Sequence, residues 1–193
     1  MEALLLSTGV VALAEIGDKT QLLAFLLAAR FKKPVPIILG ILVATVLNHG
    51  LAGALGAWIT SNVSPDILRW VLGASFIGMA IWTLIPDEIE EDEEMVAKRF
   101  GVFGATAITF FLAEMGDKTQ IATVAMAAHY PDPIMVVIGT TLGMLIADVP
   151  AVFVGDKLAK KIPMRLVHGV AAGVFALLGV ATLMGVGASL FPA

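Results

Sequence analysis

Six apolar runs, each long enough to cross a lipid bilayer, make up most of this 193-residue chain. They cover residues 3–29, 35–60, 67–86, 101–129, 134–155 and 166–190. A membrane-spanning helix needs about 20 consecutive apolar residues. The first and fourth runs are longer than that, so each must tilt, kink or break inside the bilayer. We therefore expect an all-α membrane protein with six transmembrane helices and the lipid bilayer as its main partner.

The composition excludes several functional classes. Six spans leave no room for a sizeable soluble domain, and the chain has no G-x-x-x-x-G-K-[ST] loop, so an ATP-driven pump is excluded. The net charge of −4 gives no basic footprint for nucleic acid. The absence of cysteine excludes thiolate metal sites. We expect neither an enzyme nor a resident cofactor.

Lysine and arginine are concentrated on one side of the predicted membrane. The links after the first, third and fifth runs contain nine of the twelve basic residues, whereas the opposite side has only Arg69, near the start of the third run. The positive-inside rule then places both termini outside the cytoplasm. It places the acidic segment 87–99 in the cytoplasm, where we expect a solvated loop; attraction of divalent cations is its alternative role.

One octapeptide occurs twice, 99 positions apart, as Ala14–Gln21 and Ala113–Gln120. The same offset pairs Gly40 with Gly139 and Pro34 with Pro133. The chain therefore divides into two three-helix repeats, 1–86 and 100–193, joined by the loop 87–99. Because three is odd, the second repeat enters the membrane from the opposite side. Inverted repeats of this kind build many secondary transporters, with the binding site near the midplane.

The repeated motif places carboxylates at membrane depth, where they are costly unless they face a partner or a wet cavity. On a continuous helix Glu15 and Asp18 share a face, and Lys19 can pair with Glu15. Gly17 permits local unwinding between the two acids. Lys19 and Lys118 are expected to neutralise and orient the acids, and Thr20 and Thr119 offer further oxygens.

Two motif copies meeting at the repeat interface supply an oxygen-only shell for a hard divalent cation such as Ca²⁺, Mn²⁺ or Mg²⁺. Four carboxylates and two lysines sum to −2, which one such ion cancels. Protons can replace the departing ion, because crowded carboxylates in a low dielectric repel one another. The pattern therefore predicts cation/proton exchange, with the metal ligands Glu15, Asp18, Gln21, Glu114, Asp117 and Gln120.

His49 and Asp148 occupy equivalent positions in the second and fifth runs. Ionisable residues within a span are functional candidates, as a further ligand or a proton relay. The competing interpretation is a buried residue that is hydrogen-bonded to its surroundings.

Two other functions fit the same residues. A ring of acids can form the filter of a passive divalent cation channel. Glu–Lys pairs can also lock helices together in a membrane scaffold that transports nothing. Both repeats lie in one chain, which favours a monomer and leaves a homodimer open.

The doubled E-x-G-D-K-T-Q motif resembles that of the Gcr-dependent translation factor family of Ca²⁺/Mn²⁺:H⁺ antiporters, including bacterial manganese exporters of the MneA type. The resemblance covers essentially the whole chain, with both motifs intact. It implies that the motif acids bind Mn²⁺ or Ca²⁺ and that the protein exports the ion across the bacterial plasma (inner) membrane.

Overall fold

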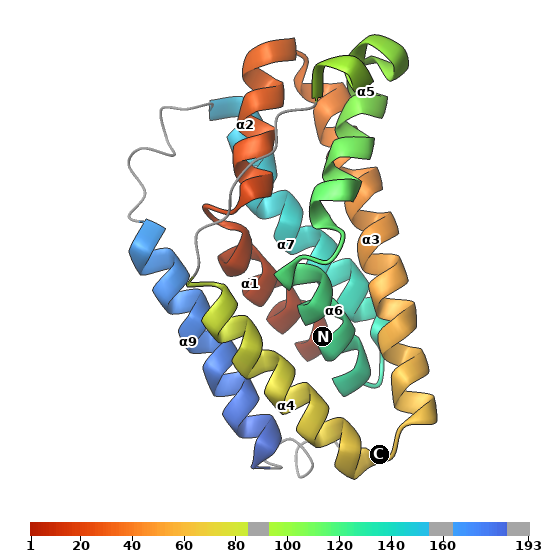
Figure 1. The fold of residues 1–193 in the computed structure, drawn as a ribbon, viewed down its shortest axis with the longest axis vertical. Helices are drawn as coiled ribbons and strands as arrows, with labels where there is room; N and C mark the ends of the chain where they lie inside the picture. Colours follow the sequence, from red (N-terminus) through yellow and green to blue (C-terminus); the bar gives the residue numbers. More distant parts are fainter. Residues whose placement is uncertain (85–92, 155–163, 185–193) are drawn as a thin grey trace.

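The structure is a computed structural model that describes residues 1–84, 93–154 and 164–184, all of them in helices or short connections (Figure 1). The all-α expectation is confirmed for this part of the chain, which contains eight helices and no strand. The helices are α1 (Glu2–Glu15), α2 (Lys19–Phe31), α3 (Pro34–Asn62), α4 (Pro65–Trp82), α5 (Glu93–Glu114), α6 (Lys118–His129), α7 (Pro133–Val154) and α9 (Met164–Leu183). The acidic residues 87–92 lie outside the described residues.

Prolines mark the beginnings of three helices, as the punctuation between the apolar runs predicts. Pro34, Pro65 and Pro133 each stand at the first position of a helix, where the missing N–H costs no hydrogen bond. Asp132 caps α7 by accepting from the backbone N–H groups of Ile134 and Met135, at 3.1 and 3.2 Å. These signals set the chain reversals that return each helix to the bundle.

The first and fourth apolar runs are broken at the repeated motif, as their excess length predicts. The helix α1 ends at Glu15 and α2 begins at Lys19, while α5 ends at Glu114 and α6 begins at Lys118. Gly17 and Gly116 have φ angles of 87° and 77° at the breaks. Glycine adopts such angles without the steric penalty that a Cβ would bring. Each motif therefore lies between two half-helices.

The half-helix before each break packs closely on a long helix of the other repeat: α1 packs on α7, and α5 packs on α3. A Cβ added to Gly139 in α7 would lie 2.6 Å from the carbonyl oxygen of Leu4 in α1. At the equivalent position in α3, a Cβ on Gly40 would lie 2.9 Å from the carbonyl oxygen of Phe103 in α5. All four residues obey the 99-residue offset. The contacts of α1 with α7 therefore reproduce those of α5 with α3.

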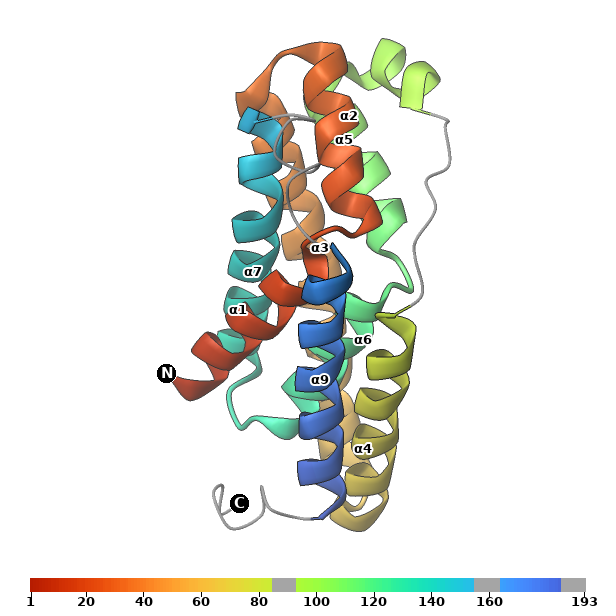
Figure 2. The same cartoon turned by 90° about the vertical axis from the view of Figure 1, so that its left-hand side faces the viewer.

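The third helices of the two repeats, α4 and α9, run side by side (Figures 1 and 2). Gly73 and Gly179 face each other there, each with the position of its Cβ within 3.3 Å of the carbonyl oxygen of the other. Glycine is enriched where membrane helices approach this closely.

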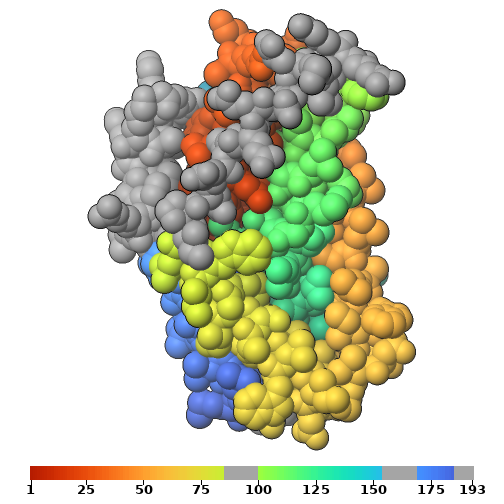
Figure 3. All heavy atoms as spheres, in the orientation of Figure 1, coloured from red at the N-terminus to blue at the C-terminus, as the bar shows by residue number. Residues whose placement is uncertain are grey.

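Large apolar side chains cover the outside of the bundle. Leu51 on α3 is 62% exposed, and Leu177 on α9 is 73% exposed. Figure 3 shows one face of the bundle, with α4 beside α6 and α3. Among the described helices, Pro34–Asn62 and Pro133–Phe153 are long and apolar enough to cross a membrane by length and composition. Length and composition therefore support a membrane span at two of the six expected positions.

Candidate metal centre

The glutamine of each motif holds the broken backbone in place. The Oε1 atom of Gln21 accepts from the backbone N–H of Gly17 at 2.9 Å, and that of Gln120 accepts from Gly116 at 2.7 Å. These bonds satisfy donors that helix interruption leaves without an intrahelical partner. The two predicted amide ligands thus lie at the breaks, with their oxygens hydrogen-bonded to the motif backbone.

The amide nitrogens of the same glutamines bind the opposite repeat. Gln21 Nε2 donates to the carbonyl oxygen of Ala147 in α7 at 3.0 Å. Gln120 Nε2 donates to the Oδ1 atom of Asn48 in α3 at 2.6 Å, and Asn48 in turn donates to the carbonyl oxygen of Phe111 at 3.0 Å. Asn48 and Ala147 are equivalent positions, so one repeat uses a side chain where the other uses backbone. Sequence reasoning gave Asn48 no role, although a buried amide in an apolar run is the signal.

The two motif glutamates are fully buried, and each has one oxygen directed to a threonine. Thr20 Oγ1 donates to Glu15 Oε2 at 2.6 Å, and Thr119 Oγ1 donates to Glu114 Oε2 at 2.9 Å. The Oε1 atom of each glutamate is buried and meets no hydrogen-bond donor among the described residues. A buried carboxylate oxygen without a partner is costly, so both atoms are candidates for binding a cation.

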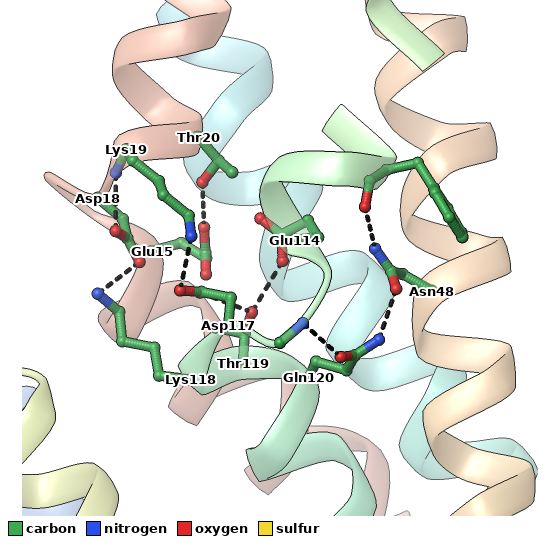
Figure 4. A network of polar contacts seen from close by, with 12 residues as sticks. Glu15, Asp18, Lys19, Thr20, Asn48, Glu114, Asp117, Lys118, Thr119 and Gln120 are labelled. Atoms are coloured by element: carbon green, nitrogen blue, oxygen red, sulfur yellow. Dashed lines mark hydrogen bonds and ion pairs between the residues drawn. The ribbon is translucent and has the colours of Figure 1, made fainter. Parts of the chain in front are cut away.

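The motif lysines form ion pairs across the repeats (Figure 4). Lys118 Nζ lies 2.6 Å from Asp18 Oδ2, and Lys19 Nζ lies 3.1 Å from Asp117 Oδ1. The expectation that Lys19 pairs with Glu15 on a continuous helix is therefore wrong. The helix break separates the two residues and directs the lysine to the other motif.

Three carboxylates from the two motifs converge on one point. The candidate ligand atoms of Glu15, Glu114 and Asp117 all lie within 4.8 Å of one another, and all three side chains are buried. Two oxygens bound to one Ca²⁺ lie at most about 5 Å apart, since each bond is about 2.3–2.6 Å long. The spacing therefore fits a shared hard cation. Figure 4 shows the glutamates on opposite sides of this point.

Asp148 lies close enough to the cluster to interact electrostatically with both Glu15 and Glu114. It is fully buried, and neither carboxylate oxygen has a hydrogen-bond partner within the described residues. His49 is also fully buried, with both ring nitrogens lacking a partner in the same part of the chain. The structure brings Asp148 to the glutamates and places His49 beside Asn48 in α3.

Comparison with known proteins identifies a family. The family model "Divalent cation/proton antiporter GDT1" matches residues 3–91 and 102–189. A Vibrio cholerae protein named "Putative manganese exporter" is 52% identical over 183 residues, which cover 94% of this chain and 90% of that protein. The rice (Oryza sativa subsp. indica) "GDT1-like protein 3" is 31% identical over 199 residues, covering 90% and 71% of the two chains. No solved structure matches.

These matches support the antiporter description given by the motifs, and they correct the family name, because nothing in them supports the words "Gcr-dependent translation factor". The matched family is one of transporters and not of enzymes. With both halves of the chain matched and both motifs intact, this protein belongs to the GDT1 family of divalent cation/proton antiporters.

Proposed function

We propose that the protein exports Mn²⁺, and also accepts Ca²⁺, in exchange for protons across the bacterial inner membrane. The observation that carries this proposal is the buried group of Glu15, Glu114 and Asp117, which comes from both breaks and has two glutamate oxygens that meet no donor in the part of the chain that the structure describes. Asp18 and the two motif glutamines complete the set of residues that hold or position the ion.

The choice of metal rests on two lines of support. Oxygen-only sites suit hard cations, and carboxylates in particular suit Mg²⁺, Ca²⁺ and Mn²⁺. The 52%-identical Vibrio cholerae relative is named a manganese exporter. Manganese is therefore the substrate to test first, with calcium beside it.

The proposed topology has six spans in two inverted repeats, 1–86 and 100–193, joined by the cytoplasmic loop 87–99, with both termini outside. The equivalent packing of Gly40 and Gly139 supports the repeat, and the distribution of lysine and arginine supports the orientation. Each break then lies near the midplane, where secondary transporters bind their ions. Both motifs come from one chain, so a monomer suffices to build the site.

The buried charges support exchange with protons. Five carboxylates and two motif lysines surround the site once Asp148 is included, a sum of −3. One divalent ion reduces this to −1, so the loaded site needs about one proton and the empty site about three. Such charges cannot stay unbalanced in the membrane interior. An exchange of two protons for one ion keeps both states neutral.

Uphill transport tests the proposal against a passive channel. Purified protein in liposomes, with a Mn²⁺-sensitive dye inside and an imposed pH gradient, should accumulate Mn²⁺ above its external concentration. Glu114→Gln should abolish this uptake, because it removes a buried ligand. Asp66→Asn, the corresponding carboxylate-to-amide change at an exposed residue of α4, should leave it intact. Downhill flux alone would indicate a channel, and absence of flux with either ion would favour the scaffold.

A further inference from the structure

The two lysine–aspartate pairs are equivalent in sequence but differ in the structure. The Lys118–Asp18 pair is short, at 2.6 Å, and sealed, with side chains 1% and 0% exposed. The Lys19–Asp117 pair is longer, at 3.1 Å, and its lysine is 24% exposed. The structure is therefore asymmetric at the point where the two repeats would be expected to match.

The same asymmetry decides which aspartate joins the metal cluster. Asp117 belongs to the group of carboxylates within 4.8 Å of one another, whereas Asp18 does not. A lysine ammonium group lies near each aspartate, but that of Lys118 is closer to its carboxylate, at 2.6 Å against 3.1 Å, and is sealed from solvent, so it would repel a cation at Asp18 more strongly. Asp117 thus lies among the cluster carboxylates with a partly exposed lysine at 3.1 Å, while Asp18 is held in the sealed pair at 2.6 Å.

If the first repeat took the conformation of the second and the second that of the first, the two lysine–aspartate pairs would exchange roles. Asp18 would then join the glutamates, and Lys19 would hold Asp117 closely. In transporters with inverted repeats, the inward-open and outward-open states are related by such an exchange, because access alternates as one repeat moves against the other.

We propose that the two aspartates take turns as ligands during transport. Both glutamates hold the ion throughout, joined by Asp117 in the orientation described here and by Asp18 in the opposite one. Lys118 and Lys19 alternately form the close, sealed pair with the aspartate that is not a ligand, while the other lysine keeps the longer, partly exposed contact with the ligating aspartate, so that no carboxylate is left uncompensated in the membrane interior. This inference rests on the proposed transport function, and it assigns the lysines to switching rather than to binding the ion.

Two charge-neutral double variants test the proposal. Asp18→Asn with Lys118→Met removes one pair, and Asp117→Asn with Lys19→Met removes its equivalent. The chain contains no cysteine. A single cysteine introduced at one face can therefore be modified by an impermeant thiol reagent, which blocks the molecules of one orientation and leaves uptake through those of the other. The measurement is the half-saturating Mn²⁺ concentration on each face of the membrane.

Each double variant should raise that concentration on one face only, and the two variants should affect opposite faces. The expected increase is about tenfold or more, since even the loss of an outer-shell partner typically costs metal sites 10–100-fold. Glu114→Gln, which removes a ligand common to both states, should abolish uptake from both faces. Equal increases on both faces for both double variants would overturn the proposal, and so would unchanged values on both faces.

Two controls keep the result interpretable. Wild-type uptake in the same vesicles separates a failure of this inference from a failure of the proposed function. If a double variant does not fold, Asp18→Glu and Asp117→Glu keep the charge and lengthen the side chain. The same opposite-face pattern is expected for them, and equal effects on both faces would again contradict alternation.

Discussion

Lys118→Met should destabilise the protein by about 3–5 kcal/mol, the usual cost of removing one partner of a buried ion pair. At the observed 2.6 Å, Coulomb attraction in a medium with an effective dielectric constant of about 20 is about 6 kcal/mol. Desolvation offsets part of this attraction in the intact pair. Removing the lysine loses the attraction and leaves Asp18 without its 2.6 Å partner.

Lys19→Met is the matched control, because Lys19 is the equivalent residue of the first repeat. At 3.1 Å the same calculation gives about 5 kcal/mol at a dielectric constant of about 20 and about 1 kcal/mol in water. The lysine is 24% exposed, so we expect a loss of about 1–3 kcal/mol, between the costs for surface and buried pairs.

The assay is reversible unfolding in mixed micelles with increasing denaturing detergent, read as a free energy of unfolding. A double-mutant cycle with Asp18→Asn isolates the pair from other effects of the lysine. The Asp18–Lys118 coupling energy should exceed the Asp117–Lys19 coupling energy. Equal couplings, or an Asp18–Lys118 coupling below about 1 kcal/mol, would refute the view that this pair is the sealed one.

Three further outcomes are expected. Gly139→Ala should lower the free energy of unfolding by about 1–3 kcal/mol, because the new methyl overlaps α1, whereas Gly50→Ala, with open space around it, should raise it by about 0.5–1 kcal/mol. Asn48→Ala should lower the free energy of unfolding by about 1–3 kcal/mol, because it leaves the buried partners of Asn48 unpaired. Asn62→Ala, at an exposed position, should lower it by about 0.5 kcal/mol or less. The apparent Mn²⁺ affinity should fall as pH falls from about 8 to 6, since carboxylates must lose protons to bind metal.

Each of these outcomes has a measurement that can contradict it. The four substitutions are compared in the same detergent unfolding assay, and similar values for Gly139→Ala and Gly50→Ala would argue against the close α1–α7 contact. Similar costs for the two asparagine variants would remove Asn48 from the support of the second break. A Mn²⁺ affinity that is constant over the pH range would count against competition between protons and metal.

The breaks and the shared acidic site were predictable because they depend on local features. The first and fourth apolar runs are longer than a bilayer requires, and within them Gly17 and Gly116 are where the chain can most easily adopt a positive φ. The 99-residue offset also identified which residues must be equivalent. These are properties of spacing and residue type, which a sequence displays directly.

The pairing of each motif lysine with the aspartate of the other motif was not predictable from the same spacing. The i, i+4 rule pairs Lys19 with Glu15 only if the helix continues, and the break removes that condition. Asp148 and Asn48 show the same limitation, because their proximity to the motifs depends on how α7 and α3 pack. A pair such as Asn48 and Ala147 also hides its common role, since one contributes a side chain and the other a carbonyl oxygen.

Direct metal binding tests the central claim that the buried carboxylates from both motifs hold one divalent ion. Purified protein in mild detergent is titrated with Mn²⁺, and free Mn²⁺ is measured by electron paramagnetic resonance. Wild type and the exposed control Asp66→Asn should each bind about one Mn²⁺ per chain at pH 8, whereas Glu114→Gln should weaken binding at least about tenfold. Unchanged binding by Glu114→Gln, or no binding by wild type, would contradict the claim.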